Sequence, residues 1–508
     1  MRAASLPSVP PAAAPGSRLG TLAAVTAPLI VLAGLLWWMV LPQNPFQSAP
    51  IVGTLLSWGA VAWAAVALRR VPPRRLAAIL VAGTVLLGVV AVGAPPRTSN
   101  DSARYAWDGI VQKAGFSPYS YVPVDETIAG LRPDWLFAPG SLDEAGRPAC
   151  AKDLFQTDSV PAVGYPSGSP LCTAINRPHV PTIYPPTAEI YFAAVRLPVP
   201  DSVGYLPFQL AGLLMSIGVT LLLLAALARR SLPPHIAAVW AWSPFVQLEA
   251  VNNAHVDLLG AALILVSGML LTRGKPLRSG LAFGAAVATK LIPVIAAPAL
   301  LFRRPVRFIA AALASFVLLY VPYLAVAGAG VLGFLPGYLK EEGYSQSGGT
   351  RFGLAQLVSA GAWPPVLSAV ALAVVAVWVL RRTHPDNVWE QQTVMIGLTL
   401  LIVSPNYPWY ALMLLPFVVL SRRWEYIAVV LALDFIYMVP LKDPFSLPLH
   451  QTALVLAAGA LVAGARWRRS RRQRLAALAG LAAGPGPCGG RAAVGTPTII
   501  TDPTTRQD

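Results

Sequence analysis

Apolar runs of about 17 to 25 residues recur along this chain, and they constrain its fold more than any other feature. Each run is long enough to cross roughly 30 Å of hydrocarbon as a helix, which satisfies its own backbone hydrogen bonds there. Only 12% of the 508 residues are charged, against roughly a quarter in a soluble domain. The sequence therefore predicts an all-α polytopic membrane protein.

Basic residues between the runs predict the topology. The formal charge is +16, but Lys and Arg form short clusters rather than one large patch, so we expect no nucleic-acid partner. By the positive-inside rule, the cluster at 69–75 faces the cytoplasm. About twelve spans then place the basic clusters and both termini on that side. These predicted spans are 22–41, 51–68, 76–94, 205–228, 234–249, 256–272, 308–326, 358–380, 390–404, 408–421, 425–440 and 451–465.

Residues 279–302 are also apolar, but basic residues flank both ends, and a single crossing would break this pattern. We interpret them as a re-entrant helical hairpin that is broken near 290–293. Such a break is tolerated only where protein or a cavity surrounds it. The segment is therefore expected to enter and leave on the cytoplasmic side.

The chain divides into five predicted segments. They are a disordered cytoplasmic N-terminus (1–20), three transmembrane helices (21–94), a long extracytoplasmic loop (95–203), a transmembrane core (204–470) and a disordered cytoplasmic tail (471–508). Cys150 and Cys172 share the long loop and could form a disulfide if that loop faces an oxidising compartment.

Polar residues gather at the predicted outer ends of the helices. Ionisable groups near membrane depth usually face a cavity or a partner, so this gathering predicts a reaction or binding site. Asp101 follows the third span, where its carboxylate could take a proton from a hydroxyl nucleophile. The alternative is a solvated aspartate that pairs with Arg104. Asp108 is a weaker candidate, as a partner or a cap.

Four further charged or titratable residues are candidates for an anion site. His255 and Asp257 begin a helix, where histidine could donate to a phosphate oxygen and the helix dipole favours an aspartate. The alternative is helix capping, which Asn252, Asn253 and Asp257 would serve. Lys290 is predicted near the hairpin apex, where a lipid-linked phosphate could balance its charge; snorkelling is the alternative. Arg351 ends a Gly-rich outer loop, Leu339–Gly353, and could contact an anion or simply remain solvated.

Residues Thr182–Pro198, with paired prolines at the start, predict a short amphipathic helix on the membrane surface that could guide a lipid. Packing against the bundle is the alternative explanation for its aromatic residues.

The sequence has no P-loop, H-E-x-x-H or G-x-G-x-x-G motif, which argues against a nucleotide-driven pump, a zinc protease and a soluble-type nucleotide-sugar site. A substrate already activated on a membrane lipid fits these absences.

The stretch NDSARYAWDGIVQKAGFSPY, at 100–119, resembles the first outer loop of GT-C glycosyltransferases, particularly the actinobacterial glycosyltransferase family 87. The similarity continues through TIYPPTAEIYF, NNAHVDLLGAALIL, ATKLIPVIAAPALLFRR and SPNYPWYALMLLPF, from about residue 95 to 425. It implies a polyprenyl-phosphate-sugar donor, usually mannose, and a glycolipid or lipoglycan acceptor. It further implies inversion at an extracytoplasmic site of the plasma membrane. No cofactor and no metal-ligating residues are expected, and the sequence leaves a requirement for a divalent metal open.

The resemblance also implies residue roles. Asp101 is carried over as the catalytic base. The expected donor-binding residues are His255, Asp257, Lys290, Arg351 and Tyr407, and the expected acceptor or loop contacts are Arg104, Tyr105, Asp108, Tyr184 and Glu189. The roles of Lys290 and Arg351 are inferred from their depth and charge rather than from the resemblance. The aspartate-bearing loop follows the third span here and the first in the GT-C pattern, which indicates two additional N-terminal helices.

Two alternatives stay open. An arabinofuranosyltransferase or another GT-C sugar specificity cannot be separated from a mannosyltransferase by sequence, because a few cavity hydrogen bonds decide sugar choice. A transporter or lipid flippase would also have many spans and a broken helix. Carriers usually have paired breaks, however, and an outer loop of roughly 100 residues is unusual for them.

Overall fold

A computed structural model describes residues 18–41, 49–142, 144, 146, 148–150, 162–164, 170–335, 337–338, 351–439 and 445–482. The described chain is mostly helical, as predicted. It forms two compact units, residues 1–460 and 461–508. The predicted disorder of the N-terminus falls on residues that lie outside the described ones, except that a helix already begins at Arg18.

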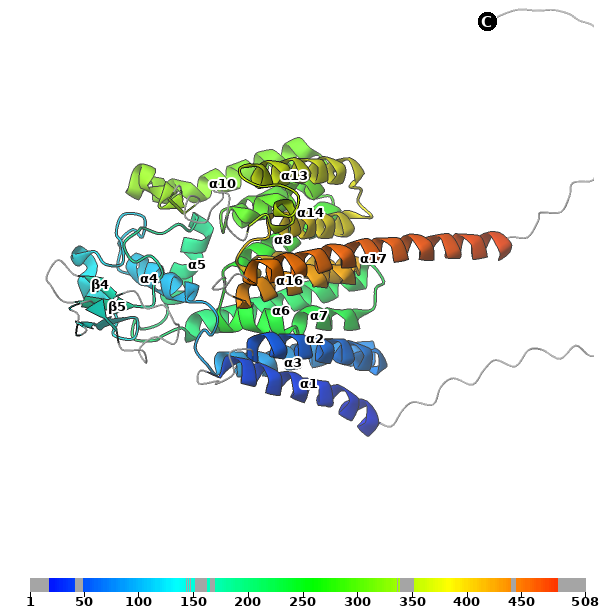
Figure 1. Cartoon of the computed structure of the whole chain (residues 1–508), viewed down its shortest axis with the longest axis horizontal. Helices are drawn as coiled ribbons and strands as arrows, with labels where there is room; N and C mark the ends of the chain where they lie inside the picture. The colour runs from blue at the N-terminus through cyan, green and yellow to red at the C-terminus, as the bar shows by residue number, and fades with distance from the viewer. Residues whose placement is uncertain are drawn as a thin grey trace, which may run out of the picture. The chain divides into compact units, whose positions relative to one another are not determined.

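Three helices open the first unit and pack together: α1 (Arg18–Val40), α2 (Ala49–Ala67) and α3 (Pro73–Val92) (Figure 1). Pro73 starts α3 because a first-turn residue needs no backbone N–H. A Cβ on Gly83 would lie 2.4 Å from the Trp242 ring, so only glycine permits that ring to pack there. The Trp242 indole N–H donates to the Leu80 carbonyl at 3.0 Å. These helices are therefore joined to the remaining bundle by close packing.

The predicted outer loop is folded, and it lies at one end of the helices (Figure 1). It contains α4 (Asp101–Lys113), η2 (Glu126–Leu131), β1 (Phe137–Pro139), β2 (Ser141–Leu142), β3 (Pro148–Ala149), β4 (Ala162–Gly164), β5 (Pro170–Thr173) and α5 (Pro186–Arg196). The antiparallel order is β1-β5-β4, with Ala138 and Ala162 opposite Cys172, and β2 pairs with β3. A disulfide joins Cys150 to Cys172. The short strands were not predicted, because none exceeds four residues.

The remaining elements form a second set of helices, many of them short. They are α6 (Leu206–Arg229), η3 (Pro234–Ala237), α7 (Ala238–Ala241), η4 (Val246–Asn252), α8 (Asp257–Thr272), α9 (Pro276–Val287), η5 (Ile292–Leu300), α10 (Pro305–Ala327), η6 (Gly328–Leu332), α12 (Gly353–Gln356), α13 (Trp363–Arg382), α14 (Val388–Val403), η7 (Pro408–Met413), α15 (Leu415–Ser421), η8 (Trp424–Tyr426), α16 (Ile427–Met438) and α17 (Ser446–Ala482).

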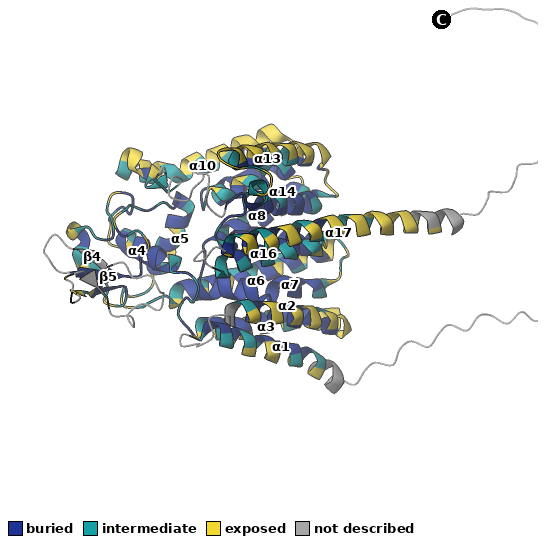
Figure 2. Cartoon of the chain, in the orientation of Figure 1, coloured by how far each residue is buried: buried dark blue, intermediate teal, exposed yellow. Residues whose placement is uncertain are grey.

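Seven of the described helices are long and apolar enough to cross a membrane, or eight if η4 and α8, bent by 111°, count as one span. The predicted number of twelve is not confirmed. The predicted span 234–249 is divided among η3, α7 and the start of η4, and α14 and α16 are shorter than a typical span. The surface of α10 and α13 is largely exposed and apolar, as expected for lipid-facing helices (Figure 2).

The predicted break near Lys290 is present, because α9 ends at Val287 and η5 begins at Ile292. Whether this segment re-enters the membrane stays a prediction.

Helices α9 and α10 approach closely: a Cβ on Gly280 or Gly284 would lie 2.3 or 2.2 Å from a backbone carbonyl of α10. Small residues at such spacing permit close packing of membrane helices.

The C-terminal helix α17 extends farther than expected. The disordered tail was predicted from residue 471, but α17 continues to Ala482. The described part of the second unit, 461–482, is the end of this helix. The rest of the predicted tail lies outside the described residues.

Candidate active site

Two consecutive asparagines hold the segment that leads to Asp101. The Asn253 side-chain oxygen accepts the backbone N–H groups of Arg97 and Thr98 at 3.0 and 3.1 Å, and that of Asn252 accepts Arg97 at 2.9 Å. The Asn253 amide donates to the Thr98 hydroxyl at 2.6 Å and to Glu249 at 3.2 Å. Since the two asparagines are fully buried, they fix the backbone three residues before Asp101, rather than capping α8 as the sequence suggested.

Asp101 begins α4 and faces a buried histidine between two carboxylates. His255 Nδ1 lies 3.5 Å from Asp101 Oδ2, and Nε2 lies 3.1 Å from Glu249 Oε2. The His255 and Glu249 side chains are fully buried, whereas Asp101 is 19% exposed. Two neighbouring carboxylates favour the protonated imidazole. Of the three groups, Asp101 is therefore the one that a substrate can reach.

The surroundings favour the ionised form of Asp101. Burial by itself raises the pKa of this carboxyl, but the contact with His255 and the positive charges of His255, Lys290 and Arg177 together hold it below its ordinary value. An ionised carboxylate beside an open pocket can accept a proton. This observation argues against the alternative of an Asp101–Arg104 pair, because Arg104 lies instead 3.8 Å from Asp108.

An aromatic ring packs against the face of the His255 imidazole, and further rings pack behind it. His255 stacks on Trp409 with ring centres 3.8 Å apart and planes at 20°, and Tyr407 stacks on Trp409 at 4.8 Å and 17°. Tyr437 packs edge-on to Trp409 at 5.4 Å, and its hydroxyl donates to the Thr98 carbonyl. The stack restricts the imidazole to the orientation that faces Asp101.

Lys290 is paired with a carboxylate that the sequence had suggested as a separate phosphate-site residue. Its ammonium lies 2.9 Å from Asp257 Oδ2 and 4.8 Å from the centre of the Tyr410 ring. Asp257 is the first residue of α8, where a carboxylate is favoured by the helix dipole. An ammonium has three donors, so an anion can bind Lys290 beside Asp257.

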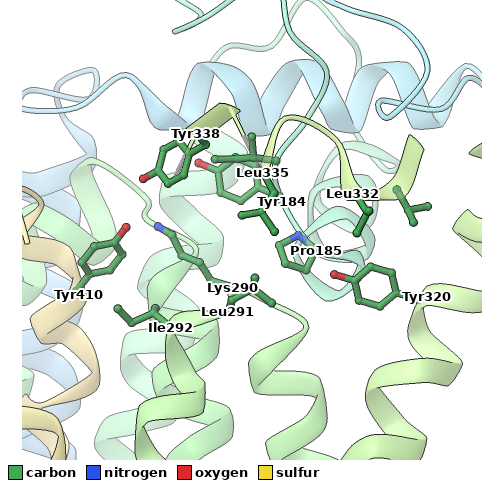
Figure 3. Close-up of a pocket in the computed structure, with 12 residues that line it drawn as sticks. Tyr184, Pro185, Lys290, Leu291, Ile292, Tyr320, Leu332, Leu335, Tyr338 and Tyr410 are labelled. Carbon is green, nitrogen blue, oxygen red and sulfur yellow. The ribbon is translucent and has the colours of Figure 1, made fainter. Parts of the chain in front are cut away.

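Two cavities meet at Lys290. A mainly apolar cavity of about 280 Å³ extends over Leu291, Ile292, Tyr320, Leu332 and Leu335, and Figure 3 shows the Lys290 ammonium reaching between Tyr338 and Tyr410. A smaller cavity of about 100 Å³ contains Asp101. It is also lined by Ser99, Asn100, Asn176, Arg177, Tyr407, Trp409 and Tyr437. The residues that line both cavities are Ile183, Tyr184, Lys290, Tyr338 and Tyr410.

Several predicted acceptor contacts line neither cavity. Asp108 and Glu189 are almost completely buried between α4 and α5. The Gln112 amide donates to Glu189 Oε2 at 2.8 Å, and the Thr182 hydroxyl donates to Glu189 Oε1 at 2.7 Å. Burial raises the pKa of Asp108 to about 6, and burial together with the Asp108 charge raises the pKa of Glu189. These two acids therefore join the outer helices.

Of the other predicted residues, some line a cavity and some do not. Tyr105 stacks on Phe192 at 4.4 Å in a buried aromatic cluster, and Arg104 donates to the Val180 carbonyl at 2.7 Å. Arg351 is 3% exposed and lines neither cavity. Tyr184 and Tyr407, in contrast, line the polar cavity as expected of site residues.

Glu249 and Tyr437 were not predicted from the sequence as site residues. Glu249 was taken as the end of a predicted span, although an acid inside the run VQLEAVNN is itself a signal of a functional or paired position. Tyr437 carried no such signal, because aromatic residues are common at membrane interfaces. Only its position beside Trp409 identifies it.

Residues 182–405 match the family model of glycosyltransferase family 87. This region is a family 87 glycosyltransferase region. The resemblance inferred from sequence is thereby confirmed, and with seven or more membrane-capable helices the chain is a membrane glycosyltransferase. The match includes His255, Asp257 and Lys290, whereas Asp101 precedes it. No curated protein and no solved structure matches the chain.

Proposed function

We propose that this protein is an inverting glycosyltransferase that moves a mannose from a polyprenyl-phosphate donor to a glycolipid or lipoglycan acceptor. We place the reaction at the outer face of the plasma membrane. The observation that carries the proposal is the adjacency of the two cavities at Lys290, because a lipid-linked sugar phosphate has an apolar part, an anionic part and a polar part in that order.

The apolar cavity suits the first part of the donor. Its volume of about 280 Å³ can take only a portion of a long prenyl chain, so the remainder would lie in the membrane. The phosphate would then meet Lys290 at the boundary, where a charge-assisted hydrogen bond to the ammonium is stronger than one between neutral groups. The sugar would occupy the polar cavity near Tyr407 and Asp101.

Asp101 supplies the base in this mechanism. Its carboxylate takes the proton of the acceptor hydroxyl while that oxygen attacks the anomeric carbon from the face opposite the phosphate. The bond between the anomeric carbon and the phosphate oxygen breaks, and its electron pair leaves with the phosphate. A single displacement of this kind inverts the configuration, and Lys290 stabilises the added negative charge.

A different sugar remains the second candidate. The polar cavity holds several hydroxyl and amide groups, and a few hydrogen bonds decide between mannose, arabinofuranose and other sugars. Transport is disfavoured by the family 87 region, although a bent helix pair is a feature that transporters also use.

The decisive experiment is transfer of radiolabelled mannose from polyprenyl-phosphate-mannose to membrane acceptors by purified full-length protein. Asp101→Asn is expected to lose transfer and retain donor binding. Asp134→Asn, the same change at an exposed position of the outer region, is the matched control. Transfer by Asp101→Asn at the wild-type rate would remove Asp101 from the mechanism. Absence of transfer in all three proteins, with other lipid-linked sugars also tested, would contradict the proposed reaction.

A further inference from the structure

The end of α17 carries a dense group of arginines that the proposed reaction does not use. The helix has 37 residues, which corresponds to about 55 Å at 1.5 Å per residue. Its first part, 446–465, contains no Asp, Glu, Lys or Arg and is about 30 Å long, the thickness of the hydrocarbon core. The charged segment therefore begins where such a span would end.

This segment, 466–474, has the sequence RWRRSRRQR, and we call it the arginine collar. The helix contains no acidic residue to balance the collar. Its arginines are exposed or half-buried. They are Arg466, Arg468, Arg469, Arg471, Arg472 and Arg474.

The distribution of the arginines around the helix indicates what they contact. Successive residues are rotated by about 100°, so the six side chains leave no sector wider than about 80° without a positive charge. A protein partner would meet one face of the helix, and a one-sided stripe would be enough for it. A collar with charge on every side instead suits surroundings that present anions in all directions, as a shell of lipid headgroups does.

A neighbouring tryptophan favours a membrane surface over nucleic acid. Trp467 is 62% exposed, and Arg471 lies 5.5 Å from the centre of its ring. Tryptophan is enriched at the headgroup level of membranes. Trp467 lies directly after the span, at the depth of the headgroups, where a bilayer accommodates both its ring and its N–H group.

We propose that the arginine collar binds the headgroups of anionic phospholipids. The leaflet is the one in which the 446–465 span ends. Clusters of four to eight basic residues beside a span bind acidic lipids through charges that act near the surface. The binding fixes the depth of α17 and concentrates acidic lipid around it.

The test uses full-length protein reconstituted with equal amounts of phosphatidylglycerol and phosphatidylcholine, then extracted in mild detergent. Mass spectrometry gives the ratio of the two lipids that remain bound. Wild type is expected to enrich phosphatidylglycerol. Changing Arg468, Arg469, Arg471 and Arg472 to glutamine should reduce the enrichment by about tenfold or more, and changing them to lysine should preserve it. The elution volume in size-exclusion chromatography confirms that each variant is folded.

A charge-matched control separates the collar from general basicity. Arg70, Arg229, Arg273 and Arg307 are four exposed residues in separate parts of the chain. Changing these four to glutamine removes the same charge without removing a whole cluster, and the enrichment should then fall far less. An unchanged enrichment in the collar variant would overturn the proposal, as would an equal fall in the control. A competition experiment compares an oligonucleotide with free phosphatidylglycerol as competitors for the bound lipid. If the oligonucleotide displaces the lipid at the lower concentration, the collar binds nucleic acid and the proposal is overturned.

Discussion

Two acids lie about two turns apart on α4, Asp101 and Asp108, and their surroundings differ. Asp101 faces His255 and an open polar cavity, and its pKa lies below the ordinary value. Asp108 is sealed beside Glu189, and burial raises its pKa to about 6. The surroundings thus favour the ionised form of one aspartate and the protonated form of the other, although both lie on the same helix. The exposure of each carboxyl group and the charge nearest to it account for the difference in pKa.

The largest effect should come from making the same substitution at both acids. Asp101→Asn is expected to reduce kcat/KM for transfer by about 10²- to 10⁴-fold, the usual contribution of a general base. Asp108→Asn should reduce it by less than about tenfold, because the amide keeps the packing between the outer helices. Steady-state transfer assays with equal amounts of folded protein measure both. Similar losses in the two variants would break the distinction.

Loss of the Lys290 charge should affect the donor rather than the base. Lys290→Met is expected to raise KM for the lipid-linked donor by about 10- to 100-fold, since a hydrogen bond to a charged group is worth about 1.5–3 kcal/mol. KM for the acceptor should change little. The double variant Lys290→Met with Asp257→Asn removes the carboxylate that the single change leaves unpaired, and should recover stability without recovering donor affinity. A rise confined to the acceptor KM would contradict the assignment.

Removal of His255 should raise the pKa of Asp101, as burial raises that of Asp108. Without the imidazole, burial dominates and the pKa of Asp101 rises. Because a general base works only when ionised, the acidic limb of the kcat/KM profile should move to higher pH. His255→Asn tests this, and His384→Asn, at an exposed position, serves as the control. An unchanged acidic limb would show that His255 does not set the charge of Asp101.

The smallest expected effect concerns stability. The folded-state pKa of Asp108 lies above that of an unfolded aspartate, so the folded state binds the proton more tightly. The contribution of Asp108 to stability is then fully present below about pH 4 and is lost as the pH rises through about 6. Between pH 5 and 7.5 this loss should lower the melting temperature by roughly 1 °C for each kcal/mol, because the shift becomes smaller as the chain becomes longer. Asp108→Asn should reduce this fall, which thermal unfolding in detergent at several pH values can detect.

The sequence predicted the helical membrane fold and part of the site, for reasons that differ by residue. Asp101, His255 and Lys290 stood out because a charged or titratable residue next to an apolar run needs an explanation. Glu249 escaped notice because it coincided with the end of a predicted span. Its pairing with His255 depends on the turn between η4 and α8, which local patterns do not specify.

The number of spans and the outer strands were harder to predict. Hydropathy measures only composition, so it treats 234–249 as one span although prolines, a tryptophan-rich turn and a π-helix divide it. Strands of two to four residues carry too few alternations to detect. The two asparagines at 252–253 looked like helix caps because local capping is their commonest role. Their true partners are distant in sequence.

This distance has a consequence for biosynthesis. Asn253 contacts Thr98 across 155 residues, and at about 5–20 residues per second the ribosome needs roughly 8–30 s to reach the second position after the first. During that interval α4 has already been synthesised, but the two asparagines that hydrogen-bond to the segment before it have not. Asp101 therefore reaches its observed position only after η4 and the asparagine at its end have been synthesised, so a nascent chain that stops before Asn253 cannot hold α4 in this place.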